Sequence, residues 1–250
     1  MIVRRSPSSS IPPLTGPHTP WLPSAELQDR SKAGRYGDFA MMVDAMIGRV
    51  LRALDDAKMT DSTLVIFSSD NGPVWYPADT QRTGHDSTGG FRGMKGSNWE
   101  AGHRMPFIAR WPGKTKAATT TAHTVCFTDV LATLAAIVDR PLPADAGPDS
   151  FSFLPVLLGR QNDRDPVRPH LLVGQSLRIG PWKWIEGRER LEWAKPDSGT
   201  YTAKNEPPGQ LYNLADDPGE KKNLAVALPE KVAEVKAAHA RIQSAAQTRR

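Results

Sequence analysis

The sequence has little that would lock a fold covalently or anchor it in a membrane. It contains a single cysteine, Cys126, which excludes an internal disulfide and a zinc site built from thiolates. No apolar run is long enough to span a bilayer, so we expect no membrane partner. Residues 1–6 carry positive charge but lack the apolar stretch of a signal peptide, and the chain as written is therefore expected in the cytoplasm.

Charge of one sign is in only mild excess. The 32 Lys and Arg residues against 27 Asp and Glu residues give a formal net charge of +5. The arginines are spread along the chain, without a helix-turn-helix, zinc-finger or aromatic RNA-binding motif, so we expect no nucleic-acid partner. A mild positive excess can instead help to attract an anionic substrate.

The apolar pattern of the first two thirds of the chain predicts an α/β arrangement. Apolar side chains recur at helical spacing over residues 34–57, which predicts one long amphipathic helix. Buried strands are expected at 64–67 and 107–111, and an apolar helix at 127–139. The long Gly-rich segment 72–104 between the strands shows no sustained period and is expected to be a functional loop.

The pattern changes near residue 170. Short β-rich segments separated by Gly and Pro predict a small antiparallel sheet from residue 171 onward. Pro229 starts a predicted terminal helix whose apolar face would dock on that sheet. We therefore predict a flexible arm at 1–15, an α/β domain at 16–165, and a C-terminal antiparallel subdomain with its helix at 166–250.

A carboxylate and a carboxamide, Asp70 and Asn71, stand directly after the first predicted strand. The dipeptides Asn71-Gly72 and Gly72-Pro73 force a turn there. Open α/β sheets bind ligands at the carboxyl ends of their strands, and two oxygen donors suit Ca²⁺ or Mg²⁺. Alone, Asp-Asn-Gly is more often a simple turn, so the surrounding motifs must decide between the two interpretations.

These surrounding motifs resemble those of the sulfatase family, the sulfate-ester hydrolases related to alkaline phosphatase. The family pattern runs Ser-Asp-Asn-Gly, Gly-x-Lys, Glu-Gly-Gly-x-Arg-x-Pro and Trp-Pro-Gly. The matching segments lie, in this order, at 69–72, 93–95, 100–106 and 111–113. The segment 17–20 is similar to the family's Pro-His-x-Pro, 149–155 to its Asp-Gly-x-Ser-x-x-Pro turn, and 210–224 to its closing segment. The resemblance implies a partial alkaline-phosphatase-like sheet flanked by helices.

The sequence departs from the family pattern in two places where glycine is usual, at Ala101 and Ser150. It also lacks the nucleophile, a Cys or Ser converted to formylglycine within a Cys/Ser-x-Pro-Ser-Arg context. Cys126 has neither the proline nor the arginine at that spacing and opens an apolar run, so we expect a buried structural thiol. With the family's first metal-binding Asp pair missing as well, the chain resembles the C-terminal portion of a sulfatase.

The resemblance assigns roles to several residues. Asp70 would be a direct metal ligand and the Asn71 amide oxygen would add to the shell, whereas Lys95 would neutralise a sulfate or leaving-group oxygen. His18 would protonate the leaving group, and His85 is a candidate for contact with substrate. Without the resemblance, Lys95 would be a solvated loop lysine and His18 a turn histidine. We expect His103 to serve packing, and Arg104 to pair with Glu100 and brace the loop.

The implied function is hydrolysis of sulfuric esters, with a sulfated small molecule or glycan as substrate and Ca²⁺ as cofactor. We expect this chain by itself to be inactive. Two alternatives remain: a non-catalytic remnant that binds or completes a partner, such as a missing N-terminal half, and a phosphate-ester hydrolase of the same superfamily.

Overall fold

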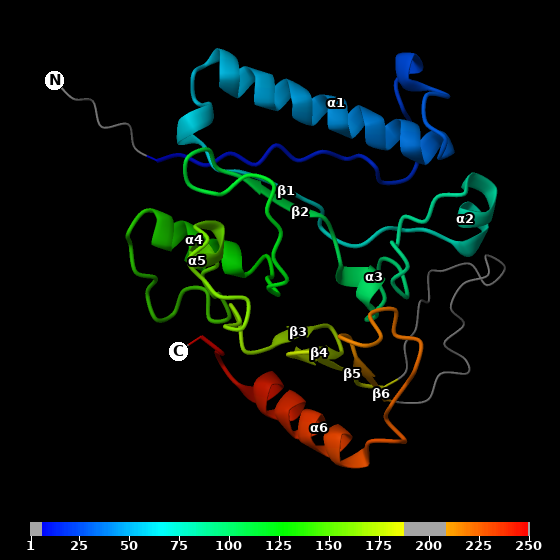
Figure 1. Ribbon diagram of the computed structural model, residues 1–250, viewed down its shortest axis with the longest axis vertical. Coiled ribbons are helices and arrows are strands. Elements are labelled where there is room, and N and C mark those ends of the chain that lie inside the picture. The colour runs from blue at the N-terminus through cyan, green and yellow to red at the C-terminus, as the bar shows by residue number, and fades with distance from the viewer. Residues whose placement is uncertain (1–6, 188–208, 250) are drawn as a thin grey trace. The chain divides into compact units, whose positions relative to one another are not determined.

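The computed structural model describes residues 7–187 and 209–249 (Figure 1). Contacts divide them into two compact units. The first comprises the described residues up to Thr63 together with Gln81–His85, and the second comprises Leu64–Thr80 and the described residues from Asp86 onward. No helix within the described residues is both long and apolar enough to cross a membrane.

The first unit is built around the long helix α1, Gly34–Asp56, which confirms the helix predicted at 34–57. Short 3-10 helices at Ala25–Leu27 and Thr60–Ser62 precede and follow it. The buried carboxylate of Asp38 accepts the backbone N–H groups of Asp29, Arg30 and Ser31 at 2.9, 3.1 and 2.7 Å. These bonds fix the chain entering α1, because three donors are satisfied by one side chain.

The second unit begins with two strands, β1 Val65–Ser68 and β2 Phe107–Arg110, close to the predicted segments. They pair antiparallel, with Val65 opposite Arg110 and Ser68 opposite Phe107. The end of β1 therefore meets the start of β2. This pairing brings residues 69–73 beside residues 100–106, which lie more than 25 positions away in the sequence.

The segment 72–104, expected to have no regular structure, contains two short helices. Helix α2 spans Pro77–Thr83 and helix α3 spans Glu100–His103. Proline is favourable in a first helical turn, and the Asp79 carboxylate accepts the Tyr76 N–H at 3.2 Å. Helix α2 is therefore stabilised by local capping, and it is too short to show the apolar period from which a helix is predicted.

Helix α4, Asp129–Ile137, confirms the helix predicted at 127–139, and the short helix α5, Leu154–Leu157, packs beside it. Buried Asp129 accepts the N–H groups of Cys126 and Phe151 and pairs with Arg168 at 3.1 Å. The expectation of a buried thiol was wrong, because Cys126 is only half-buried, in the turn that precedes α4.

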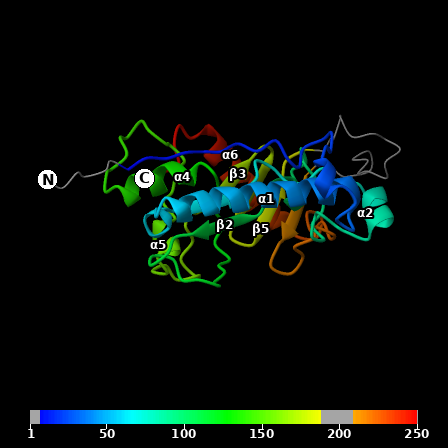
Figure 2. The same cartoon turned by 90° about the horizontal axis from the view of Figure 1, so that it is seen from above.

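The C-terminal half of the second unit is a four-stranded antiparallel sheet in the order β3-β4-β5-β6, as predicted. Its strands are Leu171–Val173, Ser176–Ile179, Trp182–Ile185 and Gln210–Asn213. Helix α6, Pro229–Ser244, begins at the predicted proline and lies along this sheet in both views (Figures 1 and 2).

The two faces of this sheet bury different partners. Trp184 and Leu211 pack against Val235 of α6. The next residue of each strand, Ile185 and Tyr212, packs with Trp99, which is fully buried. Because side chains alternate along a strand, one sheet thus joins α6 to the segment that carries Lys95.

Candidate active site

The Asp70-Asn71 turn is held against α3 by glycine. The Gly72 N–H donates to the Gly102 carbonyl at 3.0 Å. A Cβ at Gly72 would lie 1.7 Å from the carbonyl oxygen of Ala101, so no other residue fits here. Ala101 itself has ordinary helical geometry and is buried, so its departure from the family's glycine is tolerated.

The loop that carries Lys95 is joined directly to this turn. The Lys95 N–H donates to the Pro73 carbonyl at 2.8 Å. Gly93 and Gly96 flank it with φ values of 89° and 86°, which glycine adopts without strain. Inside the loop, the Ser97 hydroxyl accepts the Met94 N–H at 3.2 Å. The structure therefore joins the backbone of the Lys95 loop to the turn that carries Asp70 and Asn71.

The turn offers part of a cation site. Asp70 is exposed, and the Asn71 amide nitrogen donates to the Gly72 carbonyl at 2.9 Å, which leaves its oxygen as an available acceptor. Within residues 7–187 and 209–249, no group of three or more His, Cys, Asp or Glu side chains could hold a metal ion. Calcium takes about six to eight oxygen ligands, so these two side chains fit Ca²⁺ or Mg²⁺ only as a partial set.

A buried cluster of oppositely charged side chains supports the Lys95 loop. Lys183 on β5 lies 3.0 Å from Glu100 Oε1 and 2.9 Å from Glu220 Oε1, and its side chain is 3% exposed. Glu220 Oε2 also accepts the backbone N–H of Glu100 at 2.6 Å. The cluster ties α3, the sheet and the segment after β6 into one support.

The two carboxylates of this cluster differ in proton affinity. Burial raises the pKa of Glu220 to about 6, and Lys183 offsets this only in part. Burial acts in the same direction on Glu100, but Lys183, Arg104 and Arg178 together hold its pKa below the usual value. Burial and the Lys183 charge lower the pKa of His103, so that imidazole is neutral near pH 7.

Two arginines complete the support of the loop. Arg104 pairs with Glu100 at 3.0 Å, as predicted, and stacks over Phe91 at 4.4 Å. Arg92 donates to the Tyr212 hydroxyl and to the Glu220 carbonyl, both at 3.1 Å. These contacts brace the loop, and no other role of Arg104 is needed to explain its position.

The two predicted site histidines both belong to the first unit. His18 is exposed in a turn between Pro17 and Pro20, and its Nδ1 lies 2.6 Å from the Thr19 carbonyl. A Cβ at Gly16 would lie 2.6 Å from Val43 Cγ2, so this turn packs closely on α1.

His85 stacks on an aromatic pair in the same unit. Its ring lies 6.3 Å from that of Tyr36, which meets Trp21 edge-on at 5.5 Å. Trp21 follows the His18 turn by three residues, so both predicted histidines lie in segments that aromatic packing joins to α1. The convergence of His18 with Lys95 stays a prediction.

Sequence reasoning did not assign roles to Lys183 and Glu220. Lys183 stands between two tryptophans in a short strand, where an inward lysine needs a buried anion. Glu220 lies in the segment 210–224, which was matched to the family but given no role. A lysine at an inward strand position is the signal that could have revealed the cluster.

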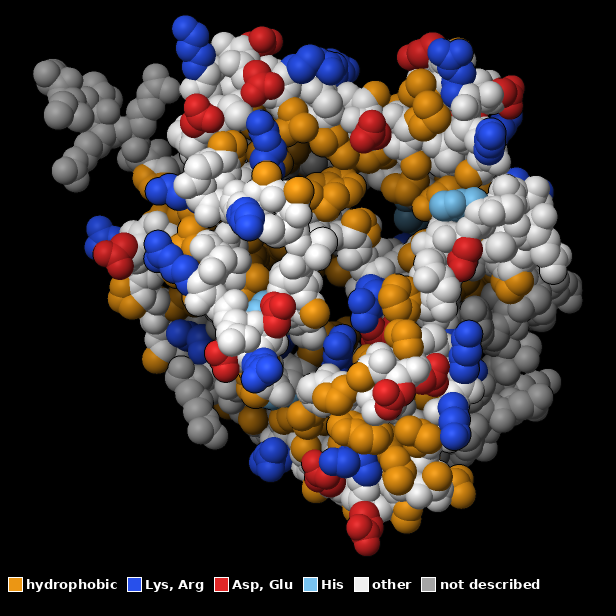
Figure 3. All heavy atoms as spheres, in the orientation of Figure 1, with side chains coloured by type: hydrophobic (Ala, Val, Ile, Leu, Met, Phe, Trp, Pro, Cys, Tyr) orange, Lys and Arg blue, Asp and Glu red, His pale blue; other side chains and the backbone are white. Residues whose placement is uncertain are grey.

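The surface around these elements carries mixed charge. On the face drawn in Figure 3, basic and acidic side chains are interspersed, and neither sign forms a continuous area. This mixture agrees with the formal net charge of +5.

The sulfatase family model matches residues 9–139 of this chain. An N-acetylgalactosamine-6-O-sulfatase of Bacteroides thetaiotaomicron is 38% identical over 228 residues, which are 87% of this chain and 43% of that protein. Human arylsulfatase A is 36% identical over 225 residues, 83% of this chain and 42% of that protein. The chain belongs to the sulfatase family, and it spans less than half the length of these relatives.

Solved structures agree with the family assignment. A Bacteroides thetaiotaomicron structure from work on the metabolism of multiple glycosaminoglycans has a TM-score of 0.80 and 34% identity, over 92% of this chain and 49% of that one. The PsFucS1 sulfatase from Pseudoalteromonas shares the fold with a TM-score of 0.67 and 23% identity, over 93% of this chain and 48% of that one. The predicted family and fold class are thus confirmed.

Proposed function

We propose that this chain carries part of the active site of a sulfate-ester hydrolase. The observation that supports it most is the hydrogen bond from the Lys95 N–H to the Pro73 carbonyl. This bond joins two family motifs, the Asp70-Asn71 turn and the Lys95 loop, into one local structure.

Cleavage of a sulfate ester at sulfur needs a nucleophile, positive charge for the sulfate oxygens and a proton for the leaving oxygen. Lys95 is half-buried, so its ammonium can act as a point charge toward one of these oxygens. His18 can donate a proton to the leaving alkoxide, because histidine is the most common general acid in enzymes. His85 would contact the group that carries the sulfate.

The proposed cofactor is Ca²⁺, with Mg²⁺ as the alternative. Asp70 and the Asn71 amide oxygen would supply two of its ligands. When bound, such an ion stabilises negative charge on sulfate oxygens. Because two ligands fall short of a full shell, we expect only weak Ca²⁺ binding by the chain itself, and calorimetry that showed tight binding would mean further ligands.

The proposed substrate is a sulfated small molecule or glycan. The names of the relatives support this class, since one acts on an N-acetylgalactosamine-6-O-sulfate group and another is an arylsulfatase.

A second candidate is a module that completes a partner polypeptide. Helix α4 and the turn before it expose an apolar stripe at helical spacing: Phe127, Leu131, Leu134 and Val138, each 40–47% exposed. Such a stripe normally packs against another element. We propose as its occupant the part of a sulfatase that the matched relatives possess beyond the span of this chain.

One experiment tests both candidate functions. The purified chain is assayed with Ca²⁺ and a chromogenic aryl sulfate, alone and mixed with the unmatched portion of the Bacteroides thetaiotaomicron relative. We expect no turnover by the chain alone, because its sequence contains no formylglycine motif, and turnover by the mixture. A stable but inactive complex would favour the non-catalytic candidate, and turnover by the chain alone would contradict the account of the missing nucleophile.

A further inference from the structure

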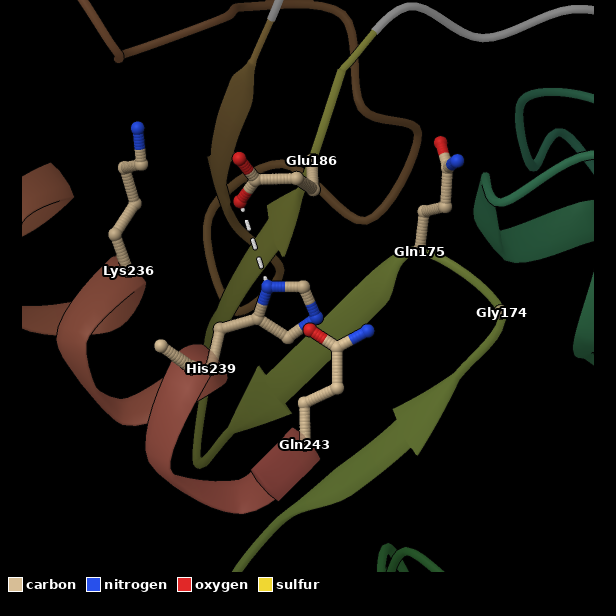
Figure 4. A pocket seen from close by; sticks show the side chains of 7 residues that line it. Gly174, Gln175, Glu186, Lys236, His239 and Gln243 are labelled. Atoms are coloured by element: carbon tan, nitrogen blue, oxygen red, sulfur yellow. Dashed lines mark hydrogen bonds and ion pairs between the residues drawn. The ribbon is translucent and has the colours of Figure 1, made fainter.

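A hollow of about 330 Å³ opens between α6 and the turn that joins β3 to β4. Its polar lining comes from three places: Gln175 in the turn, Glu186 after β5, and Lys236, His239 and Gln243 on α6 (Figure 4). None of these residues belongs to the candidate active site described above.

His239 carries a buried nitrogen that needs a partner. Its side chain is 7% exposed, and its Nδ1 lies 3.4 Å from Glu186 Oε2. The other ring nitrogen, Nε2, is buried without a hydrogen-bond partner among the described residues. Figure 4 shows the imidazole between the Glu186 carboxylate and the Gln243 side chain, at the wall of the hollow. Burying an unpaired polar atom is unfavourable, so the ring marks a position for a ligand atom that pairs with it.

Glu186 is fixed in place and ionised. The Trp184 indole N–H donates to its Oε2 at 2.8 Å, and this bond is the main reason why the pKa of Glu186 lies below the usual value. Its carboxylate is still 44% exposed toward solvent. It can therefore accept a hydrogen bond from a ligand without first losing its own orientation.

The lining carries one charge of each sign, so it has no net charge that would favour an anion or a cation. An anion would be attracted by the Lys236 ammonium but repelled by the Glu186 carboxylate, and the reverse holds for a cation. Gln175 and Gln243 add amide groups that both donate and accept hydrogen bonds. A neutral molecule with several hydroxyl groups satisfies all of these side chains at once. The volume lies at the small end of ligand pockets, which suits one sugar ring.

We propose that this hollow binds a neutral sugar unit through hydrogen bonds from its hydroxyl groups to Glu186, His239 and Gln243. The site is connected to the Lys95 loop, because the Gln175 N–H donates to the Asn98 side-chain oxygen at 3.0 Å. Its use as a secondary subsite for an unsulfated unit of a glycan rests on the proposed function. Binding of a free sugar to the hollow does not rest on that proposed function.

The test is a two-dimensional amide NMR titration of the full chain with N-acetylgalactosamine, galactose and, separately, sodium sulfate. We expect saturable shifts for either sugar, with millimolar dissociation constants because the ligand is small and the site open. The affected amides should be those of Gln175, Glu186 and Gln243, and sulfate should leave them unchanged.

Two variants localise the effect. Glu186→Gln removes the charged acceptor and should weaken sugar binding at least about fivefold, as expected for a lost charge-assisted hydrogen bond. Glu230→Gln, the same change at an exposed position at the start of α6, should bind like the natural chain. Gln243→Ala, at an exposed position, serves as a second test if Glu186→Gln does not fold.

Three results would overturn the proposal. These are the absence of saturable shifts with both sugars at tens of millimolar, shifts that lie away from the hollow, and saturable binding of sulfate in place of sugar. Each is measured on the natural chain without any hydrolysis assay, so failure here is separate from failure of the proposed sulfatase function.

Discussion

At the scale of single residues, the site depends on close backbone approach more than on reactive side chains. Sequence motifs placed a turn at Asp70-Asn71, and the structure gives the reason why Gly72 follows it. The carbonyl of Ala101 occupies the space that a side chain at position 72 would need. The glycine is therefore a requirement of the contact between β1 and α3.

Gly72→Ala should destabilise the second unit by at least about 2 kcal/mol, because its Cβ would lie 1.7 Å from a backbone oxygen and the chain must move apart. Urea unfolding followed by tryptophan fluorescence measures this change. Gly219→Ala is the control, since its Cβ would meet the flexible Lys221 side chain at 3.2 Å and should cost little. Equal effects of the two changes would contradict the close-approach account.

Glu220 should make stability depend on pH. Its pKa is raised from 4.5 to about 6 in the folded state, so the folded chain holds this proton more tightly than the unfolded chain does. The stabilisation is fully present below pH 4.5 and is lost as the pH rises through about 6. The difference corresponds to about 2 kcal/mol.

Glu220→Gln removes this titration, and so its free energy of unfolding should rise relative to that of the natural chain between acidic and neutral pH. Urea unfolding across that range measures both chains. Glu100 and Lys183 face the same group, but they remain in both chains, so the difference isolates Glu220. A difference that does not change with pH would show that the pKa of Glu220 is the same in the folded and unfolded chains, which contradicts the account.

At the scale of elements, the sequence predicted those with strong apolar periodicity. Helix α1, helix α4, the C-terminal strands and helix α6 all lie close to their predicted bounds. Helices α2 and α3 were missed because they span only seven and four residues, too few to show an apolar period. The antiparallel pairing of β1 with β2 was also missed, since strand order depends on distant contacts.

The Lys183 cluster could not be predicted in full for the same reason. Its carboxylates come from α3 and from the segment after β6, and only the folded sheet brings them to one side chain. The pairing of Arg104 with Glu100 was predictable, because these residues lie four positions apart, at the start of α3 and directly after its end. An ion pair between residues close in the sequence can be inferred from their spacing, whereas the Lys183 cluster can be recognised only in the folded structure.

Lys183→Met should destabilise the second unit by about 3–5 kcal/mol, because it leaves two buried carboxylates without their shared cation. It should also speed hydrogen exchange of the Lys95 amide, since the loop loses its support. Lys231→Met is the matched control. Its partner Glu234 is 66% exposed, and the change should cost no more than about 1 kcal/mol.

Unfolding curves and amide exchange rates for the three chains measure both effects. If Lys183→Met lowered stability without any change in exchange at Lys95, the cluster would stabilise the fold but not support the loop.

At the scale of the whole molecule, the chain is a member of the sulfatase family that spans less than half the length of the relatives it matches. The Asp70-Asn71 turn, the Lys95 loop and the ion cluster beneath them form one local structure in the second unit. His18 and His85 lie in the first. The central claim of the proposed function is that these two histidines act in the same reaction as Lys95 and the Asp70-Asn71 turn.

The most direct test of that claim is a chimera in which this chain replaces the matched span of the Bacteroides thetaiotaomicron relative. Its rate of hydrolysis of a chromogenic aryl sulfate is measured with Ca²⁺, beside the same chimera carrying Lys95→Ala, His18→Ala or the exposed control Lys114→Ala. We expect turnover by the chimera, a loss of about a hundredfold or more with Lys95→Ala and with His18→Ala, and no loss with Lys114→Ala. A folded chimera that hydrolyses the ester equally well with Lys95→Ala would contradict the account.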